Sequence, residues 1–140
     1  LISKHTLNDE QTRAFLLLAD KIGVELEKGR KDSPMTVLCT GPGGTGKSVI
    51  FRAWEDFYKA VGHPEHLRLT APTGVVASDI GGCTIHAEAS LRILPAKMKS
   101  TPNLRTNLEE RIAHLETLIL DEVYFLNAND LARLSEYLCM

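Results

Sequence analysis

The stretch GPGGTGKS, residues 41–48, contains the residue types that wrap the phosphates of a nucleotide. It fits the pattern G-x-x-x-x-G-K-[ST], in which glycines let backbone N–H groups turn toward a β-phosphate at the start of a helix. A lysine here offsets phosphate charge, and the serine hydroxyl ligates Mg²⁺. A plain glycine-rich turn is the alternative. The candidate nucleotide-binding residues in this loop are Gly41, Gly43, Gly44, Thr45, Gly46, Lys47 and Ser48.

A pair of acids ends the apolar run LILDEV. An acid at the carboxyl end of a strand can hold the water shell of a magnesium ion, and Asp121 is the candidate for that role. Glu122, beside it, can accept a proton from a water molecule that attacks the γ-phosphate, or orient that water. The alternative is a solvated turn. With a phosphate loop in the same chain, the pair favours hydrolysis over phosphoryl transfer to a small molecule.

Strand and helix patterns alternate around these motifs, as in an α/β domain with a parallel sheet. Helical spacing of apolar residues, with Asn8 as N-cap, predicts a helix that ends at Gly29 and has Phe15, Leu18, Ile22 and Leu26 on its apolar face. Short apolar runs predict strands. The expected strands are 35–40, 67–71 and 117–123, and the other expected helices are 47–61, 75–80, 102–115 with Thr101 as its N-cap, and 128–138.

Composition is typical of a globular protein: 44% of the 140 residues are hydrophobic, 24% are charged, and the net charge is −2. No apolar run approaches the roughly 20 residues of a membrane span, so we expect a soluble protein without a membrane partner. Three widely spaced cysteines fit no disulfide framework or zinc spacing, which predicts buried thiols in a reducing compartment. The first residue is Leu1 and a helical pattern reaches Met140, as expected for a piece of a longer chain.

Four segments in order, LNDEQ, GPGGTGKS, APTGVVASDIGGCTIHA and LILDEV, resemble the first segments of the petite integration frequency (PIF-type) helicases. These are superfamily 1 motors that move 5′ to 3′ on single-stranded DNA. The resemblance implies a RecA-like three-layer domain over residues 1–140, incomplete at its C-terminus, with a second motor domain absent. It matches Gln11 to a glutamine that reads adenine, since a carboxamide can pair with N6 and N7. A solvated helix residue is the alternative for Gln11.

The third segment has the chemistry of a DNA-backbone contact. Thr73 and Gly74 lie where a strand ends and a helix begins, where exposed N–H groups bind an anion such as a phosphate. The resemblance adds Pro72, Thr84 and His86 as DNA-binding residues; His86 as a simple turn cap is the alternative. Such contacts do not read sequence, so binding is expected to be unspecific and salt-sensitive.

The resemblance therefore implies an ATP-dependent DNA helicase with ATP, Mg²⁺ and single-stranded DNA as ligands. Lys47 and Glu122 are the catalytic candidates, and Ser48 and Asp121 the magnesium ligands. The family's roles are in DNA repair, recombination and telomere maintenance, which implies an intracellular protein of the nucleus, with the mitochondrion as the alternative. No targeting signal is visible.

Two features depart from this family pattern. The family's usual Asp-Glu-x-Ser-Met is here Asp121-Glu122-Val123-Tyr124-Phe125. The chain also ends before a Gly-Asp-x-x-Gln segment. A non-catalytic ATP- or DNA-binding remnant therefore stays open, as does a small-molecule kinase, although no acceptor pocket or lid arginines are found.

Two other sets of residues are interpreted structurally. His63 and His66 in HPEH are metal-ligand types, but no third or fourth ligand follows at a recognisable spacing, so a loop is the prediction. Trp54 shares a helical register with Ile50 and Phe57, which predicts a place in the core rather than a stack on a base.

Overall fold

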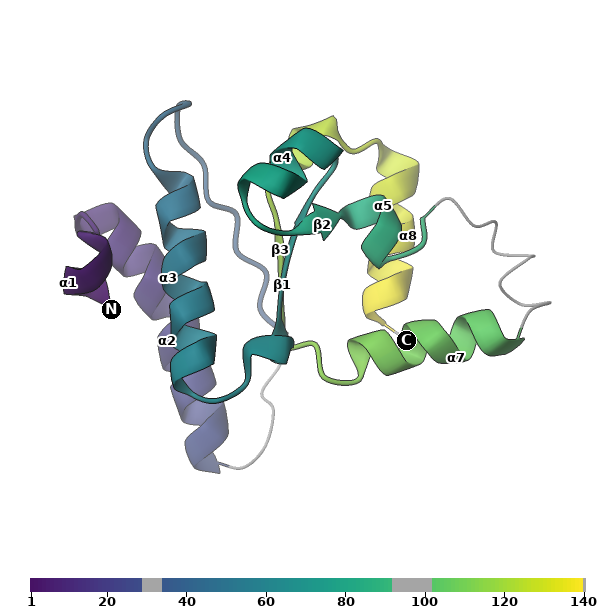
Figure 1. Ribbon diagram of the computed structural model, residues 1–140, viewed down its shortest axis with the longest axis horizontal. Helices are drawn as coiled ribbons and strands as arrows, with labels where there is room; N and C mark the ends of the chain where they lie inside the picture. The colour runs from purple at the N-terminus through teal and green to yellow at the C-terminus, as the bar shows by residue number, and fades with distance from the viewer. Residues whose placement is uncertain (29–33, 92–101, 140) are drawn as a thin grey trace. The chain divides into compact units, whose positions relative to one another are not determined.

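The computed structural model describes residues 1–28, 34–91 and 102–139. They form two compact units, Leu1–Gly62 and His63–Met140 (Figure 1). The expected caps Gly29 and Thr101, and the side chain of Leu26, lie outside the described part.

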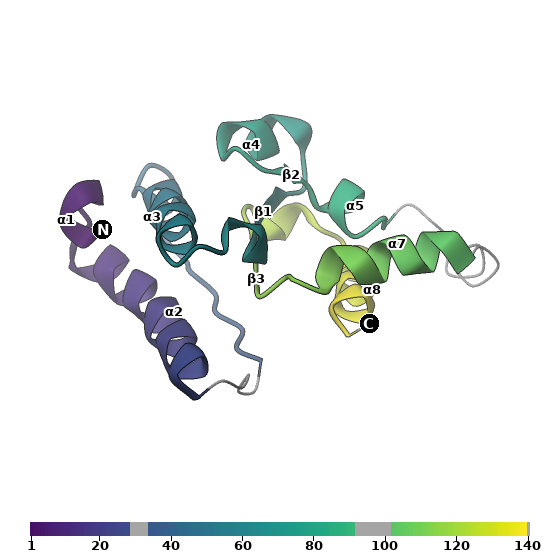
Figure 2. The same ribbon diagram turned by 60° about the horizontal axis from the view of Figure 1, so that its bottom comes forward.

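The described residues of the first unit form three helices, and two of them, α2 and α3, pack along one another (Figure 2). Phe15 of α2 meets Phe57 of α3 edge to face, with ring centroids 6.1 Å apart. The predicted core position of Trp54 is confirmed: its side chain is buried and its Nε1 donates to the Phe15 carbonyl at 3.3 Å. The helices are α1 (Ile2–His5), α2 (Asp9–Lys28) and α3 (Lys47–Ala60).

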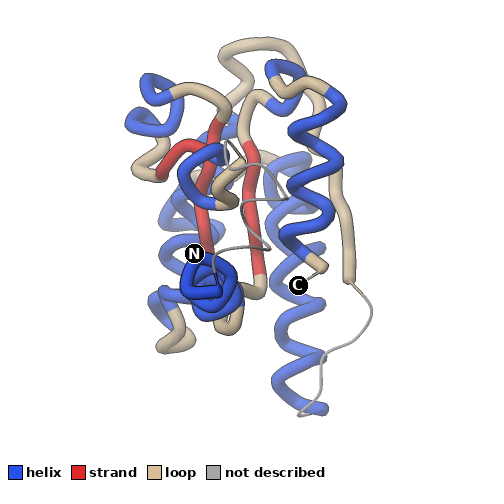
Figure 3. Tube along the Cα trace, turned by 90° about the vertical axis from the view of Figure 1, so that its right-hand side faces the viewer, coloured by secondary structure: helices blue, strands red, loops and turns tan. Residues whose placement is uncertain are grey.

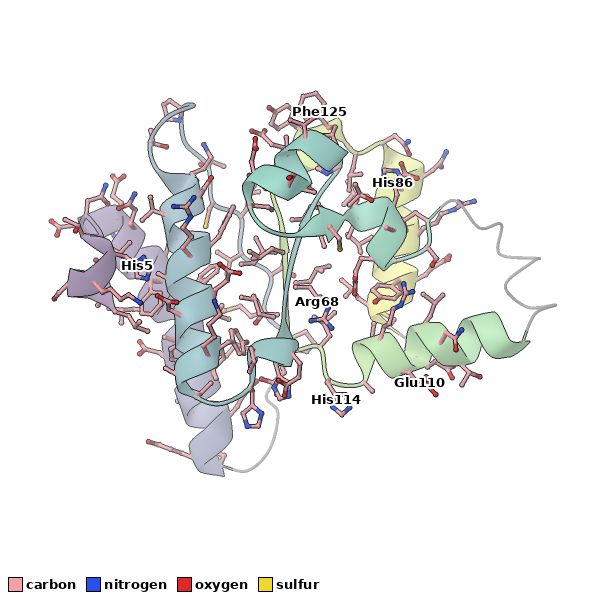
Figure 4. The ribbon with its side chains drawn as sticks, in the orientation of Figure 1. His5, Arg68, His86, Glu110, His114 and Phe125 are labelled. Atoms are coloured by element: carbon pink, nitrogen blue, oxygen red, sulfur yellow. The ribbon has the colours of Figure 1, made fainter. Side chains whose placement is uncertain are left out.

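The short helix α1, which the sequence did not predict, is held to α3 by charge. Lys4 Nζ donates to Asp56 Oδ2 at 2.6 Å, and His5 Nε2 lies 2.9 Å from the same oxygen. Figure 4 shows His5 between the two helices. These hydrogen bonds from Lys4 and then His5 lower the pKa of Asp56 below its ordinary value.

The predicted strand over residues 35–40 is wrong, because this segment forms no strand in the structure. An isolated extended segment needs a neighbouring strand for its backbone groups, and the described residues of the first unit are otherwise helices and turns. Its apolar side chains are accordingly exposed, and Leu38 is 73% exposed. The phosphate loop is thus preceded by an irregular segment.

A parallel sheet of three strands, in the order β2-β1-β3, forms the centre of the second unit (Figure 3). Leu67 pairs with Thr117 at the start of the β1/β3 ladder, and Ala71 pairs with Thr84 at the end of the β1/β2 ladder. The predicted strand 67–71 is confirmed, whereas the strand predicted over 117–123 is shorter because the chain turns at Asp121. The strands are β1 (Leu67–Ala71), β2 (Cys83–Thr84) and β3 (Thr117–Leu120).

Helices after each strand cover this sheet and complete the α/β fold that the sequence predicted. Ile85 of α5, Leu108 of α7 and Leu134 of α8 belong to one buried cluster, against which Leu118 and Leu120 of β3 pack. The helix predicted over 102–115 ends three residues early, and the one over 128–138 is confirmed. The helices of this unit are α4 (Gly74–Asp79), α5 (Ile85–Glu88), α7 (Pro102–Ile112) and α8 (Ala128–Leu138), with 3₁₀ turns η1 (Pro64–His66) and η2 (Val123–Phe125).

The expectation of buried thiols is wrong. Cys39 and Cys139 are exposed and Cys83 is half-buried, and all three are free. Cys39 lies in the segment that does not join a sheet, and Cys139 lies at the C-cap of α8, where a helix end meets solvent. In the described residues, no helix is both long and apolar enough to cross a membrane.

Candidate nucleotide and DNA site

The phosphate loop occupies an exposed turn at the start of α3. Gly44 and Gly46 have φ of 76° and 80°, a left-handed conformation that disfavours a side chain. Gly46 is the N-cap of α3, no side chain caps this end of the helix, and no acid lies in its first turn. The N–H groups and the positive end of the helix dipole therefore face outward near Lys47 and Ser48, as an anion-binding site requires.

Two side chains of the loop contact its own backbone. Lys47 Nζ donates to the carbonyls of Gly41 at 3.0 Å and Pro42 at 3.1 Å, and Thr45 Oγ1 donates to Pro42 at 2.9 Å. The ammonium group is thus folded over the loop. To neutralise phosphate charge it would exchange these carbonyls for phosphate oxygens, which are stronger acceptors because they are charged.

Gln11 links the first turn of α2 to the phosphate loop. Its Nε2 donates to the carbonyls of Thr45 at 3.3 Å and Gly46 at 3.1 Å. Its Oε1 accepts from the Asn8 N–H at 3.0 Å, while Asn8 Oδ1 accepts from the Gln11 N–H at 2.9 Å. This reciprocal capping box supports Asn8 as the helix N-cap. Gln11 is therefore beside the loop, with both ends of its carboxamide engaged.

The predicted DNA-binding threonines lie at the carboxyl edge of the sheet. Thr73 follows β1 and Thr84 ends the neighbouring β2, each as the N-cap of the next helix. Their hydroxyl oxygens accept from Val76 N–H at 3.4 Å and Ala87 N–H at 3.2 Å. Since a hydroxyl also has a proton to donate, each can still bind a phosphate oxygen. Pro72 and Gly74 lie on either side of Thr73.

The side chain of His86 contacts helix α8. Its Nε2 lies 3.2 Å from Asp130 Oδ2, and the same oxygen accepts from Asn127 Nδ2 at 2.9 Å. Figure 4 shows His86 on α5, beside α8. The alternative interpretation of His86 was a simple turn cap, but its side chain also contacts a second helix. Asp130 gave no signal of this in the sequence, because its distance from His86 along the chain is 44 residues.

Asp121 and Glu122 continue from β3 at the same edge. The Asp121 N–H donates to the Thr70 carbonyl of β1 at 2.9 Å, and Asp121 Oδ1 accepts from the Glu122 N–H at 3.0 Å. Glu122 has φ 53° and ψ 43°, a left-handed conformation that is uncommon for a residue with a side chain. Strained backbone of this kind is concentrated at functional sites.

Tyr124 and Phe125 form an exposed aromatic pair next to the acids. They are 72% and 61% exposed, with ring centroids 4.5 Å apart. A hydrogen bond to Glu122 raises the pKa of the Tyr124 hydroxyl above its ordinary value. Figure 4 places Phe125 at the end of the second unit opposite His114. The substituted tyrosine therefore contacts the proposed catalytic acid.

Within each unit, the structure brings several candidate residues together. In the first unit Gln11 contacts the phosphate loop, across 35 residues of sequence. In the second unit Thr73, Thr84 and Asp121 follow or end three adjacent parallel strands. The sequence did not predict the contact of His86 with Asp130 or the contact of Tyr124 with Glu122.

Known proteins with a similar sequence include several DNA helicases. A family model described as PIF1-like helicase matches residues 6–139. ATP-dependent DNA helicase PIF1 of Saccharomyces cerevisiae (strain YJM789) is 32% identical over 102 residues, which are 70% of this chain and 12% of that protein. The helicase PIF1 of Emericella nidulans is 31% identical over 132 residues, 87% of this chain and 16% of that protein.

A third relative, ATP-dependent DNA helicase RRM3 of Saccharomyces cerevisiae, is 31% identical over 107 residues, 71% of this chain and 14% of that protein. The chain belongs to the PIF1-like helicase family. It spans between 12% and 16% of the length of these three relatives.

Proposed function

We propose that this chain is the ATP- and DNA-binding part of the first motor domain of an ATP-dependent 5′-to-3′ DNA helicase. One observation supports this most directly: Thr73, Thr84 and Asp121 follow or end three adjacent strands at one edge of the parallel sheet. Ligands of open α/β sheets bind outside the carboxyl ends of the strands. The family membership supports the helicase activity and its direction.

In this proposal the phosphate loop holds the triphosphate of ATP. N–H groups at the start of α3 bind the β-phosphate, and Lys47 shifts from the loop carbonyls to the β- and γ-phosphates. Gln11 reads the adenine. The Gln11 Nε2 is engaged with the carbonyls of Thr45 and Gly46, so recognition of the base requires that Nε2 exchange these carbonyls for adenine N7. Its Oε1, which accepts from the Asn8 N–H, would accept from adenine N6.

For magnesium, the ligand that we propose in the first unit is Ser48 and the ligand that we propose in the second unit is Asp121. The Ser48 hydroxyl is exposed, and the Asp121 carboxylate keeps lone pairs beyond the one that accepts the Glu122 N–H. These are the hard oxygen donors that magnesium prefers. Bound magnesium would neutralise the charge that develops between the β- and γ-phosphates. Glu122 takes the proton from, or orients, the attacking water.

Single-stranded DNA would bind through its phosphates to Pro72, Thr73, Gly74, Thr84 and His86. Contacts to phosphate position a strand without reading its sequence. Movement along the strand requires a second motor domain of the same longer chain. The nucleus is the proposed compartment, with the mitochondrion as the alternative, and repair, recombination and telomere maintenance are the proposed processes.

The hydrogen bond between Tyr124 and Glu122 favours a second candidate, a remnant that binds ATP or DNA without turnover. A phenol at this carboxylate competes with the attacking water for the same oxygen. The remnant therefore differs from the motor in one step, hydrolysis, and not in nucleotide binding.

The experiment is an ATPase assay of the full-length protein that contains this chain, with and without single-stranded DNA. Stimulation by DNA supports the motor. Binding of Mg-ATP without turnover supports the remnant, and phosphorylation of a metabolite in place of DNA-stimulated hydrolysis supports the kinase alternative. Absence of nucleotide binding would contradict the motor and the kinase, and would leave only a remnant that binds DNA.

A further inference from the structure

Three histidines and two glutamates gather where β1 and β3 begin, in the second unit. Parallel pairing of Leu67 with Thr117 places the residues before them, His66 and Glu116, side by side, and the Glu116 N–H donates to the His66 carbonyl at 2.9 Å. The turn η1 adds Glu65, and His63 is its N-cap. The ring of His114 stacks on that of His66 with centroids 6.4 Å apart. Figure 4 shows His114 at this end of the unit.

Three of these residues have donor atoms at the spacing of metal ligands. His63 Nδ1 lies 3.3 Å from Glu65 Oε1, and His66 Nε2 lies 3.4 Å from the same oxygen. All three donor atoms lie within 4.8 Å of one another. Ligands 2.0 to 2.2 Å from a tetrahedral zinc ion are separated by about 3.3 to 3.6 Å.

The ring of His66 lies between two carboxylates. Its Nδ1 lies 3.3 Å from Glu116 Oε2, so both ring nitrogens face a carboxylate. A neutral imidazole has a single N–H. If Nδ1–H donates to Glu116, the lone pair of Nε2 points toward Glu65, and a cation between them removes the repulsion. This is the carboxylate–histidine–metal arrangement, in which an outer carboxylate fixes the tautomer of the ligand.

We propose that His63, Glu65 and His66 bind a zinc ion, with Glu116 orienting the His66 ring. Two imidazoles and a carboxylate suit zinc, and water would take the fourth position. The His63 and His66 rings are stacked with centroids 4.6 Å apart, so His63 must turn to place the metal in its ring plane. Its side chain is about half exposed, which leaves room for this rotation. The ion would join the turn before β1 to the start of β3.

The test uses residues 1–140 without a histidine tag, freed of metal with a chelator and titrated with zinc chloride in a calorimeter. We expect one zinc ion per chain, with a dissociation constant of about 10 µM or below. Zinc should also raise the melting temperature, because it binds the folded state. Magnesium chloride in excess should not compete, because it prefers oxygen ligands.

Variants separate this site from adventitious binding. His63→Ala and Glu65→Gln change exposed side chains and should each weaken zinc binding at least tenfold, with folding retained. Glu116→Gln should weaken zinc binding about tenfold, as is typical when an outer carboxylate is removed. The control His5→Gln changes a histidine of the other unit and should bind zinc as the unchanged chain does. Binding weaker than about 100 µM, or equal binding by His63→Ala, would overturn the proposal and leave His66 as a histidine that contacts two carboxylates without a metal.

Discussion

The side-chain amide of Gln11 donates to the main-chain oxygen of Gly46, the residue that caps the helix after the phosphate loop. A Cβ on Gly46 would lie 2.7 Å from this Gln11 nitrogen, so the contact also depends on glycine at position 46. A residue proposed to read the base therefore holds the loop proposed to bind the phosphates.

This contact makes Gln11→Ala the test of base recognition. If Gln11 exchanges the loop for adenine, its loss narrows the preference for ATP over GTP, because a bidentate contact to adenine is worth about 1 to 3 kcal/mol. Competition binding of ATP and GTP to the full-length protein measures the ratio. An equal weakening of both nucleotides would mean that Gln11 only supports the loop.

Tyr124→Phe tests whether the tyrosine restrains the proposed catalytic acid. The variant keeps the ring but removes the hydroxyl that bonds to Glu122. We expect faster DNA-stimulated ATP hydrolysis at unchanged ATP affinity, since the carboxylate is then available to water. Because this bond raises the pKa of Tyr124 above 10.0, the hydroxyl stays protonated and the difference between the proteins should persist from about pH 7 to pH 9.

Slower ATP hydrolysis by Tyr124→Phe would contradict the prediction that the tyrosine restrains Glu122, and would show that the phenol assists Glu122. Tyr124→Ser, which restores the residue usual in the family, provides the second comparison and should behave as Tyr124→Phe does.

Glu122→Gly tests whether the backbone at the acidic pair is strained. Left-handed backbone costs a residue with a side chain roughly 1 to 2 kcal/mol, and glycine removes that cost while adding about 0.5 to 1 kcal/mol of flexibility to the unfolded chain. We therefore expect the free energy of unfolding to stay within about 1 kcal/mol of the unchanged chain, while hydrolysis in the full-length protein is lost.

The matched control is Glu136→Gly, an exposed acid near the end of α8. Glycine in an ordinary helical position should lower the free energy of unfolding by about 1 kcal/mol. Urea unfolding of both variants gives the comparison. A larger loss in the free energy of unfolding for Glu122→Gly than for Glu136→Gly would contradict the prediction that the backbone at Glu122 is strained.

Gly82→Ala tests a close backbone approach in the second unit. A Cβ on Gly82 would lie 2.1 Å from the Leu69 carbonyl oxygen of β1, so the backbone must move. We expect Gly82→Ala to lower the free energy of unfolding by about 1 to 3 kcal/mol, as overpacking of a core does. Gly74→Ala, with no atom within 4 Å of its Cβ, should be neutral or more stable by up to about 1 kcal/mol. Equal urea midpoints for the two variants would contradict the close approach.

Local patterns were enough to predict much of the fold. Helical spacing predicted α2, α3 and α8, and a buried apolar run predicted β1, because in each case neighbouring residues determine the element. The run 35–40 is also mostly apolar, but a strand depends as well on a partner strand, which composition does not reveal. The wrong expectation that Cys39 is buried follows from the same error, because Cys39 lies in this run.

The sequence supplied candidate site residues where motifs are continuous, but it did not reveal contacts between residues that are distant along the chain. GPGGTGKS and the Asp121-Glu122 pair were identified from their spacing. The proposed zinc ligands His63, Glu65 and His66 are adjacent in the sequence, but the support of His66 by Glu116 was not visible, because Glu116 contacts His66 only through the pairing of β1 with β3, 50 residues along the chain. Two histidines in HPEH were accordingly interpreted as a loop.

The chain of residues 1–140 alone should bind Mg-ATP weakly and unwind nothing. Translocation needs two domains that grip the strand in turn, and an arginine finger from a second domain is worth about 10³ to 10⁵ in rate. An assay on a duplex with a 5′ single-stranded tail measures this. Robust unwinding by the isolated chain would contradict the proposal that it is part of a two-domain motor.

The most direct test of the central claim compares Lys47→Ala with Glu122→Gln in the full-length protein, measuring both Mg-ATP binding and DNA-stimulated hydrolysis. Lys47→Ala should lose nucleotide binding, because the ammonium that offsets phosphate charge is gone. Glu122→Gln should still bind Mg-ATP, while hydrolysis falls by a factor on the order of 10² to 10⁴. Equal loss of binding in both variants, or unchanged hydrolysis in Glu122→Gln, would contradict the assignment of this chain to an ATP-hydrolysing motor.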